Sequence, residues 1–149
     1  KLWIIPAANT KTKQEHRVPL APRAVTLLQS LPKLAGNPKL FPSARGKALS
    51  DMALSQLMRR MRERGELKVA AVPHGFRSSF RDWAAEQTSY SDEIRKAASG
   101  HTVGDSVHQA YQRTDLLEKR RRLMNEWAKF LDRPSKIKQN NVRAIKGKV

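Results

Sequence analysis

The sequence predicts an α+β domain that is mainly helical, with a small antiparallel β-hairpin near its start. Three observations indicate this class. Two short apolar runs flank a polar stretch at the N-terminus, apolar residues recur at helical spacing through most of the remainder, and the chain has 149 residues. That length suits one domain with a buried core, and 39% hydrophobic residues argue against a chain without one. We expect the domain to span residues 1–132 and a basic tail to occupy 133–149.

The first third of the chain predicts a hairpin and a helix. Residues 2–5 and, apart from Arg17, residues 17–20 are apolar or β-branched, as β-strands commonly are, and a polar segment joins them. Pro22 suits the first position of a helix, which must stop before Pro32. Residues 32–48 are rich in Pro, Gly, Ser and Lys and therefore predict a loop.

The middle of the chain predicts two helices, of which the second has two distinct faces. The first runs from an N-cap at Ser50 to Gly65, and the second begins after Pro73. At about 100° per residue, three aromatic residues share one face of the second helix: Phe76, Phe80 and Trp83. Three other side chains share the opposite face: His74, Arg77 and Arg81.

The last part of the chain predicts three more helices. Ser91 is an N-cap for a short helix that Gly100 ends in a left-handed conformation. Residues 107–111 indicate another short helix, and apolar residues at helical spacing across 116–131 predict a long one.

The charge of the chain points to polyanionic partners. The formal net charge is +17, and the two ends supply most of it. Residues 1–49 carry nine basic residues and one acidic residue, whereas 133–149 carry six basic residues and no acidic one. We interpret 133–149 as a flexible segment that neutralises phosphates, or as a tail that serves only solubility.

The composition also excludes several classes. With no cysteine, the chain has no disulfide scaffold, thiolate zinc site or cysteine nucleophile. It has no apolar run of the roughly 20 residues that a membrane helix needs, and its first residues do not show the basic-then-apolar pattern expected of a leader. Because the chain begins at Lys1 within an apparent strand, we expect it to be a piece of a longer protein.

Five residues supply the chemical groups that DNA strand cleavage without a metal requires. They are Lys11, His74, Arg77, His101 and Tyr111. A phenol can attack phosphorus, a guanidinium can hold two phosphate oxygens, and imidazole or ammonium groups can exchange protons with oxygen. Each residue taken alone is more often structural or solvated, so the hypothesis depends on their order and spacing.

That order resembles a known family. HGFRSSFRDWA, SGH and AYQRTD, followed by a basic helix that contains a Trp, occur in this order within residues 71–131. The pattern resembles the C-terminal catalytic domain of the tyrosine recombinase (phage integrase) family, especially the integrases of prophages and genomic islands. The opening WIIP, KTK and HRVPL segments resemble the β-hairpin of that domain, so the resemblance covers residues 2–132.

The resemblance implies site-specific DNA recombination through a 3′-phosphotyrosine intermediate, with no cofactor and no metal. Tyr111 would be the nucleophile, and Lys11 the general acid for the leaving 5′ oxygen. Three residues would stabilise the pentacoordinate phosphorane: His74, Arg77 and His101. The implied partners are double-stranded DNA attachment sites and, on DNA, further copies of the protein in a tetramer; without DNA we expect a monomer. The implied location is the bacterial cytoplasm, in association with the nucleoid.

The family also uses an Arg upstream of the hairpin, which neither Arg17 nor Arg23 matches. We therefore expect the 149 residues to fold and bind DNA weakly but to recombine nothing alone. Several alternatives stay open. Lys13 competes with Lys11 as general acid, and Tyr90 competes with Tyr111 as nucleophile, although an anchoring role suits Tyr90 better. His108 is expected to be a surface residue. The chain as a whole could instead be a non-enzymatic DNA-binding module or a type IB topoisomerase.

Overall fold

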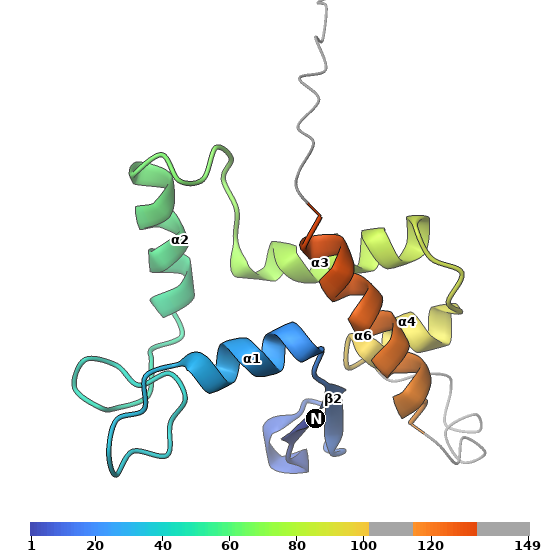
Figure 1. The fold of residues 1–149 in the computed structure, drawn as a ribbon, viewed down its shortest axis with the longest axis horizontal. Helices are drawn as coiled ribbons and strands as arrows, with labels where there is room; N and C mark the ends of the chain where they lie inside the picture. Colours follow the sequence, from blue (N-terminus) through green and yellow to red (C-terminus); the bar gives the residue numbers. More distant parts are fainter. Residues whose placement is uncertain (102–114, 134–149) are drawn as a thin grey trace, which may run out of the picture.

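The computed structural model describes residues 1–101 and 115–133, which contain one small sheet and five α-helices (Figure 1). The sheet has two antiparallel strands, β1 (Leu2–Ile5) and β2 (His16–Pro19), paired from Leu2 with Pro19 to Ile5 with His16. A 3-10 turn, η1 (Ala7–Asn9), opens the connection between them. The mainly helical fold with an N-terminal hairpin is confirmed, and the second strand begins one residue before its predicted start.

The helices of the described residues follow in the predicted order, whereas the short helix predicted for 107–111 and the predicted tail beyond residue 133 lie outside them. The described helices are α1 (Pro22–Ser30), α2 (Ala53–Glu63), α3 (Pro73–Glu86), α4 (Asp92–Ala98) and α6 (Leu117–Leu131). Ser91 is the residue before α4, and Gly100 after it has the expected left-handed φ of 67°. The predicted N-cap at Ser50 is wrong. The Ser50 carbonyl accepts a turn hydrogen bond from the backbone of Ala53, and Met52 precedes α2.

The core lies where α3, α4 and α6 meet. Its buried side chains are Phe80, Trp83, Ala84, Ile94 and Leu123. Trp127 of α6 lies against the two α3 aromatics, with ring centroids 5.5 Å from Phe80 and 5.0 Å from Trp83. These separations are typical of favourable aromatic pairs. Phe76, which shares this face of α3 by its spacing, is 62% exposed, so the core begins one turn later.

The other two helices contribute little to this core. Figure 1 shows α2 on the far side of the molecule from α4 and α6, whereas α1 starts beside β2 and its Arg23 pairs with Asp132 at the end of α6. No residue of α1 is buried, and Met58 is the buried residue of α2. Large apolar side chains of both helices stay exposed, among them Leu27, Leu54 and Leu57. None of the helices in the described part of the chain is long and apolar enough to cross a membrane.

Candidate active site

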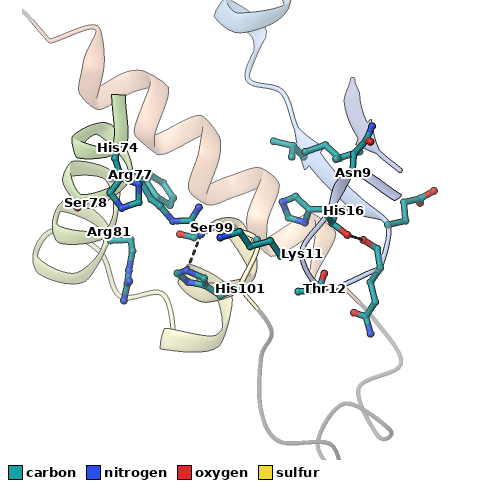
Figure 2. A pocket seen from close by; sticks show the side chains of 18 residues that line it. Asn9, Lys11, Thr12, His16, His74, Arg77, Ser78, Arg81, Ser99 and His101 are labelled. Carbon is teal, nitrogen blue, oxygen red and sulfur yellow. Dashed lines mark hydrogen bonds between the residues drawn. The ribbon is translucent and has the colours of Figure 1, made fainter. Parts of the chain in front are cut away.

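A cleft of about 900 Å³ separates the hairpin from α3 and the end of α4. Figure 2 shows its two walls facing each other, one from the η1 connection and β2, the other from α3 and the turn after α4. Four of the five predicted site residues line it: Lys11, His74, Arg77 and His101. The chain therefore folds so that groups from three separate segments face one solvent-filled space. Tyr111 and His108 lie outside the described residues.

The α3 wall exists because the helix is amphipathic. Pro73 is its first residue, where a missing N–H costs nothing, and Phe80 and Trp83 fix its opposite side in the core. His74, Arg77 and Arg81 therefore face away from the core and line the cleft. Arg81 adds a second guanidinium to this wall.

The turn after α4 brings His101 to Arg77. The Arg77 guanidinium donates hydrogen bonds to the Ser99 carbonyl and to Nε2 of His101, the latter at 2.9 Å. Gly100 lies between these two partners and adopts the left-handed conformation that glycine tolerates best. Because a guanidinium can only donate, Nε2 of His101 accepts this bond and the ring is neutral.

The charges of the cleft reinforce that neutral state. The pKa of His101 is lowered mainly by partial loss of solvent around the ring. The positive charges of Arg77, Arg81 and Lys96 lower it further. The same cations would attract a phosphate into the cleft, because an anion between them reduces their mutual repulsion.

On the hairpin wall, Lys11 rather than Lys13 lines the cleft. Figure 2 shows the Lys11 side chain extending from the hairpin towards Ser99 and His101. The single proton of the Thr10 hydroxyl lies within hydrogen-bond distance of two carbonyls, those of Ala7 at 3.0 Å and Gln14 at 2.8 Å, and this contact links the two sides of the loop that carries Lys11. This geometry favours Lys11 over Lys13 as the candidate general acid, an alternative that the sequence left open.

His16 is a cleft residue that the sequence reasoning missed. It lies on β2 opposite Ile5, and a Cβ placed on Gly100 would be 3.4 Å from its Nε2. The pKa of His16 is lowered, mainly by partial burial and next by the positive charge of Arg120. The charge of Asp115 acts in the opposite direction, and Arg77 lowers the pKa slightly further. The alternation of a strand was the available signal, because His16 and Val18 must share one face of β2.

Tyr90, the competing nucleophile, is half-buried against the core and is not among the residues that line the cleft. Its hydroxyl donates to Oε1 of Glu126 at 2.7 Å. Burial, together with this hydrogen bond and the charge of Glu126, raises the pKa of Tyr90 to about 12. A phenol in this setting is a poor source of phenolate, and its contacts are those of an anchoring aromatic.

Comparison with known proteins gives an independent indication of what the chain is similar to. Residues 1–117 match the Phage integrase family. The chain is 33% identical over 126 residues to the Prophage integrase IntA of Escherichia coli (strain K12), covering 85% of this chain and 30% of that protein. It is 31% identical over 147 residues to the Integrase of Enterobacteria phage P4, covering 88% and 33%. No solved structure matches the chain. The chain thus spans about a third of the length of these relatives.

Proposed function

Because this chain belongs to the phage integrase family, we propose that it carries the catalytic groups of a site-specific DNA recombinase. The observation that supports this proposal is the cleft, which gathers Lys11, His74, Arg77 and His101 from distant parts of the sequence. The chain spans about a third of the length of its relatives, so we use the term full-length integrase for a protein of their length that contains these residues. Recombination, DNA recognition and assembly are proposed for that protein.

The proposed reaction is a transesterification at phosphorus. The Tyr111 phenol releases its proton to water, and its oxygen forms a bond to the phosphorus of one DNA strand while the bond from phosphorus to the 5′ oxygen breaks. The product is a 3′-phosphotyrosine link and a free 5′ hydroxyl. Attack by a 5′ hydroxyl of another strand reverses these bond changes and exchanges the strands. The tyrosine takes a proton back from water when it leaves in the second step. No cofactor is needed, because each step conserves one phosphodiester bond.

The cations of the cleft would stabilise the charge of the phosphorane. Arg77 can offer two parallel N–H donors to equatorial oxygens, a geometry that an ammonium cannot provide. His74 and His101 flank it on the same wall. Ionising a free phenol at pH 7 costs roughly 4 kcal/mol, since its pKa is near 10. A concentrated positive field lowers that cost.

Lys11 would protonate the leaving oxygen. It reaches the cleft from the wall opposite Arg77, so a phosphate held by Arg77 can present its 5′ oxygen to the ammonium group. The proton moves from Lys11 to the 5′ oxygen during cleavage. It returns to the resulting amine when an incoming 5′ hydroxyl attacks.

Double-stranded DNA is the proposed partner, since the net charge of +17 matches a polyanion. We propose a tetramer on DNA, a monomer without DNA, and action in the cytoplasm of a bacterium. The 149 residues alone are expected to show no recombination, because the additional Arg of the family has no match among them. Robust strand cleavage by the isolated chain would contradict this last expectation.

A suicide DNA substrate, nicked so that the 5′ fragment diffuses away after cleavage, tests the proposal. The full-length integrase should form a covalent protein–DNA product that is resolved by denaturing electrophoresis. Tyr111→Phe should abolish the product, since phenylalanine has no oxygen nucleophile, while DNA retention stays intact. Tyr90→Phe is the matched control and should still form the product.

Three outcomes would overturn the assignment. Loss of the adduct in Tyr90→Phe, with Tyr111→Phe still active, would move the nucleophile to Tyr90. DNA retention without any adduct would instead indicate a non-enzymatic DNA-binding module. Cleavage and resealing of one duplex without strand exchange would indicate topoisomerase activity.

A further inference from the structure

One buried charged cluster lies outside the cleft and has no role in the chemistry described above. Arg120 of α6 is 2% exposed, the most buried charged side chain of the described residues. Its guanidinium donates to the Asp115 carbonyl at 2.7 Å, to Oδ2 of Asp115 at 2.7 Å and to the Arg17 carbonyl at 2.6 Å. Arg17 also pairs with Oδ2 of Asp115, at 2.8 Å. We call Arg17, Asp115 and Arg120 the hairpin lock.

The hairpin lock ties β2 to α6 and to the residues just ahead of it. Arg120 binds the backbone of β2, whereas the Arg17 side chain crosses to Asp115. Asp115 also accepts a hydrogen bond from the backbone of Leu117 at the start of α6. One carboxylate therefore connects the strand, the helix start and the buried guanidinium.

Because side chains alternate along β2, anchoring this strand also positions the residues that line the cleft. His16 and Val18 line the cleft, and the Arg17 side chain, on the other face of the strand, reaches Asp115. The strand is thus anchored through Arg17, while its neighbours His16 and Val18 line the cleft that Arg77 and His101 also line. The η1 connection that carries Lys11 leads directly into this anchored strand.

We propose that the hairpin lock is a positioning device that holds Lys11 at the correct distance for protonating the leaving 5′ oxygen. The inference rests on the proposed function. A buried arginine with directional acceptors defines the orientation of a strand more narrowly than an apolar contact of the same size would. Such narrow placement matters for proton transfer, because a general acid must lie within hydrogen-bond distance of the oxygen it serves.

The test compares two DNA substrates in the full-length integrase. One has the natural 5′ oxygen at the scissile phosphate, and the other has a bridging sulfur in its place. A thiolate leaves without protonation, so the sulfur substrate does not need the general acid. The variants are Asp115→Asn, which removes the carboxylate charge, and Arg17→Met, which removes only the half-exposed ion pair. Arg121→Met, which breaks a neighbouring surface pair with Glu118 on the same helix, is the matched control.

The expected result is a substrate-dependent defect. Asp115→Asn should slow adduct formation on the oxygen substrate by roughly 10- to 100-fold, a partial loss of the roughly 10²- to 10⁴-fold that general acid catalysis supplies. The sulfur substrate should restore the rate to near that of the wild type, as it should for Lys11→Ala. Arg17→Met should show the same pattern with a smaller loss, and Arg121→Met should show none.

Equal loss on both substrates would overturn the inference, because the lock would then support only the fold or the nucleophile. An unchanged rate in both Asp115→Asn and Arg17→Met would also overturn it. If the wild type forms no adduct with either substrate, the proposed function itself fails. If Lys11→Ala is not rescued by sulfur, the role of Lys11 fails while the recombinase assignment stands.

Discussion

The two walls of the cleft are held in place by different forces. The α3 wall stands on an aromatic core, where Trp127 of α6 packs against Phe80 and Trp83. The hairpin wall has little apolar support, and Trp3 and Ile4 of β1 are 58% and 52% exposed. What fixes it is the hairpin lock of hydrogen bonds and ion pairs.

This difference separates the tasks of the two walls. Close packing of aromatic side chains gives a rigid platform, which suits the groups that we propose to bind a phosphate, such as Arg77. Directional charged contacts set the orientation of the hairpin, and they respond to substitutions that change charge but not size. Substitutions that remove side-chain volume from the core should therefore destabilise the α3 wall. Substitutions that remove a charged partner from the hairpin lock should destabilise the hairpin wall.

The largest effect is expected from the core. Leu123→Ala removes a side chain of α6 that is 0% exposed and leaves a cavity beneath the α3 wall. The free energy of unfolding should fall by about 2–5 kcal/mol, the range for leucine truncation in a close-packed interior. Urea unfolding of the chain, followed by tryptophan fluorescence, measures the loss.

Leu131→Ala is the matched control on the same helix, because Leu131 is 60% exposed. It should cost less than about 0.5 kcal/mol. If the two substitutions destabilise the chain equally, the core does not lie where α3, α4 and α6 meet.

The second effect tests the lock as a source of stability. Arg120→Met keeps most of the side-chain volume but leaves the Arg17 carbonyl and part of Asp115 without a donor. The free energy of unfolding should fall by about 1–3 kcal/mol, the cost of unsatisfied buried polar groups. Arg120→Lys should recover little of it, since one ammonium cannot match the planar guanidinium contacts.

Arg121→Met again provides the comparison, because its pair with Glu118 lies on the surface and should contribute less than about 1 kcal/mol. Amide hydrogen exchange should show faster opening of β2 in Arg120→Met, with α3 still protected. Faster exchange in α3 but not in β2 would contradict the prediction, because the hairpin lock would then stabilise the α3 wall and not the hairpin wall.

Periodicity was enough to predict the elements that pack against one another. The apolar spacing of α3 and α6 gave their positions, and Pro22, Pro73 and Gly100 marked ends that the structure confirms. The N-cap at Ser50 failed because a turn uses its carbonyl and the helix starts later. Apolar spacing and helix-end residues such as Pro and Gly depend on only a few neighbouring residues, so they can be recognised in the sequence alone.

Contacts between distant residues could not be predicted in the same way. The lock joins Arg17 to Asp115 and Arg120, about a hundred positions away, and nothing near Arg17 indicates that pairing. His16 was missed for a related reason, because its environment comes from Gly100 and Arg120 rather than from its own strand. For Lys11, His74, Arg77 and His101, the order along the chain pointed to one cleft because it resembled a family.

The smallest effect concerns the pH dependence of stability. The pKa of His16 in the folded chain lies below its ordinary value of 6.5, chiefly because of burial and the charge of Arg120. Below pH 6.5 the unfolded chain therefore binds more protons than the folded one at this site, and stability falls with falling pH. His16→Gln removes this titration, so the decrease in unfolding free energy between pH 7.5 and 5.5 should become shallower. Urea unfolding at intervals across this range measures the slope.

His101→Gln is the comparison, because the pKa of His101 is also lowered but its ring lies at the exposed edge of the cleft. Solvent screens its neighbours' charges, so this substitution should change the slope less than His16→Gln does. An unchanged slope in His16→Gln would place its imidazole in water rather than between β2 and Gly100. The hairpin wall would then lie farther from α3, and Lys11 would lose the approach to the cleft on which its proposed role depends.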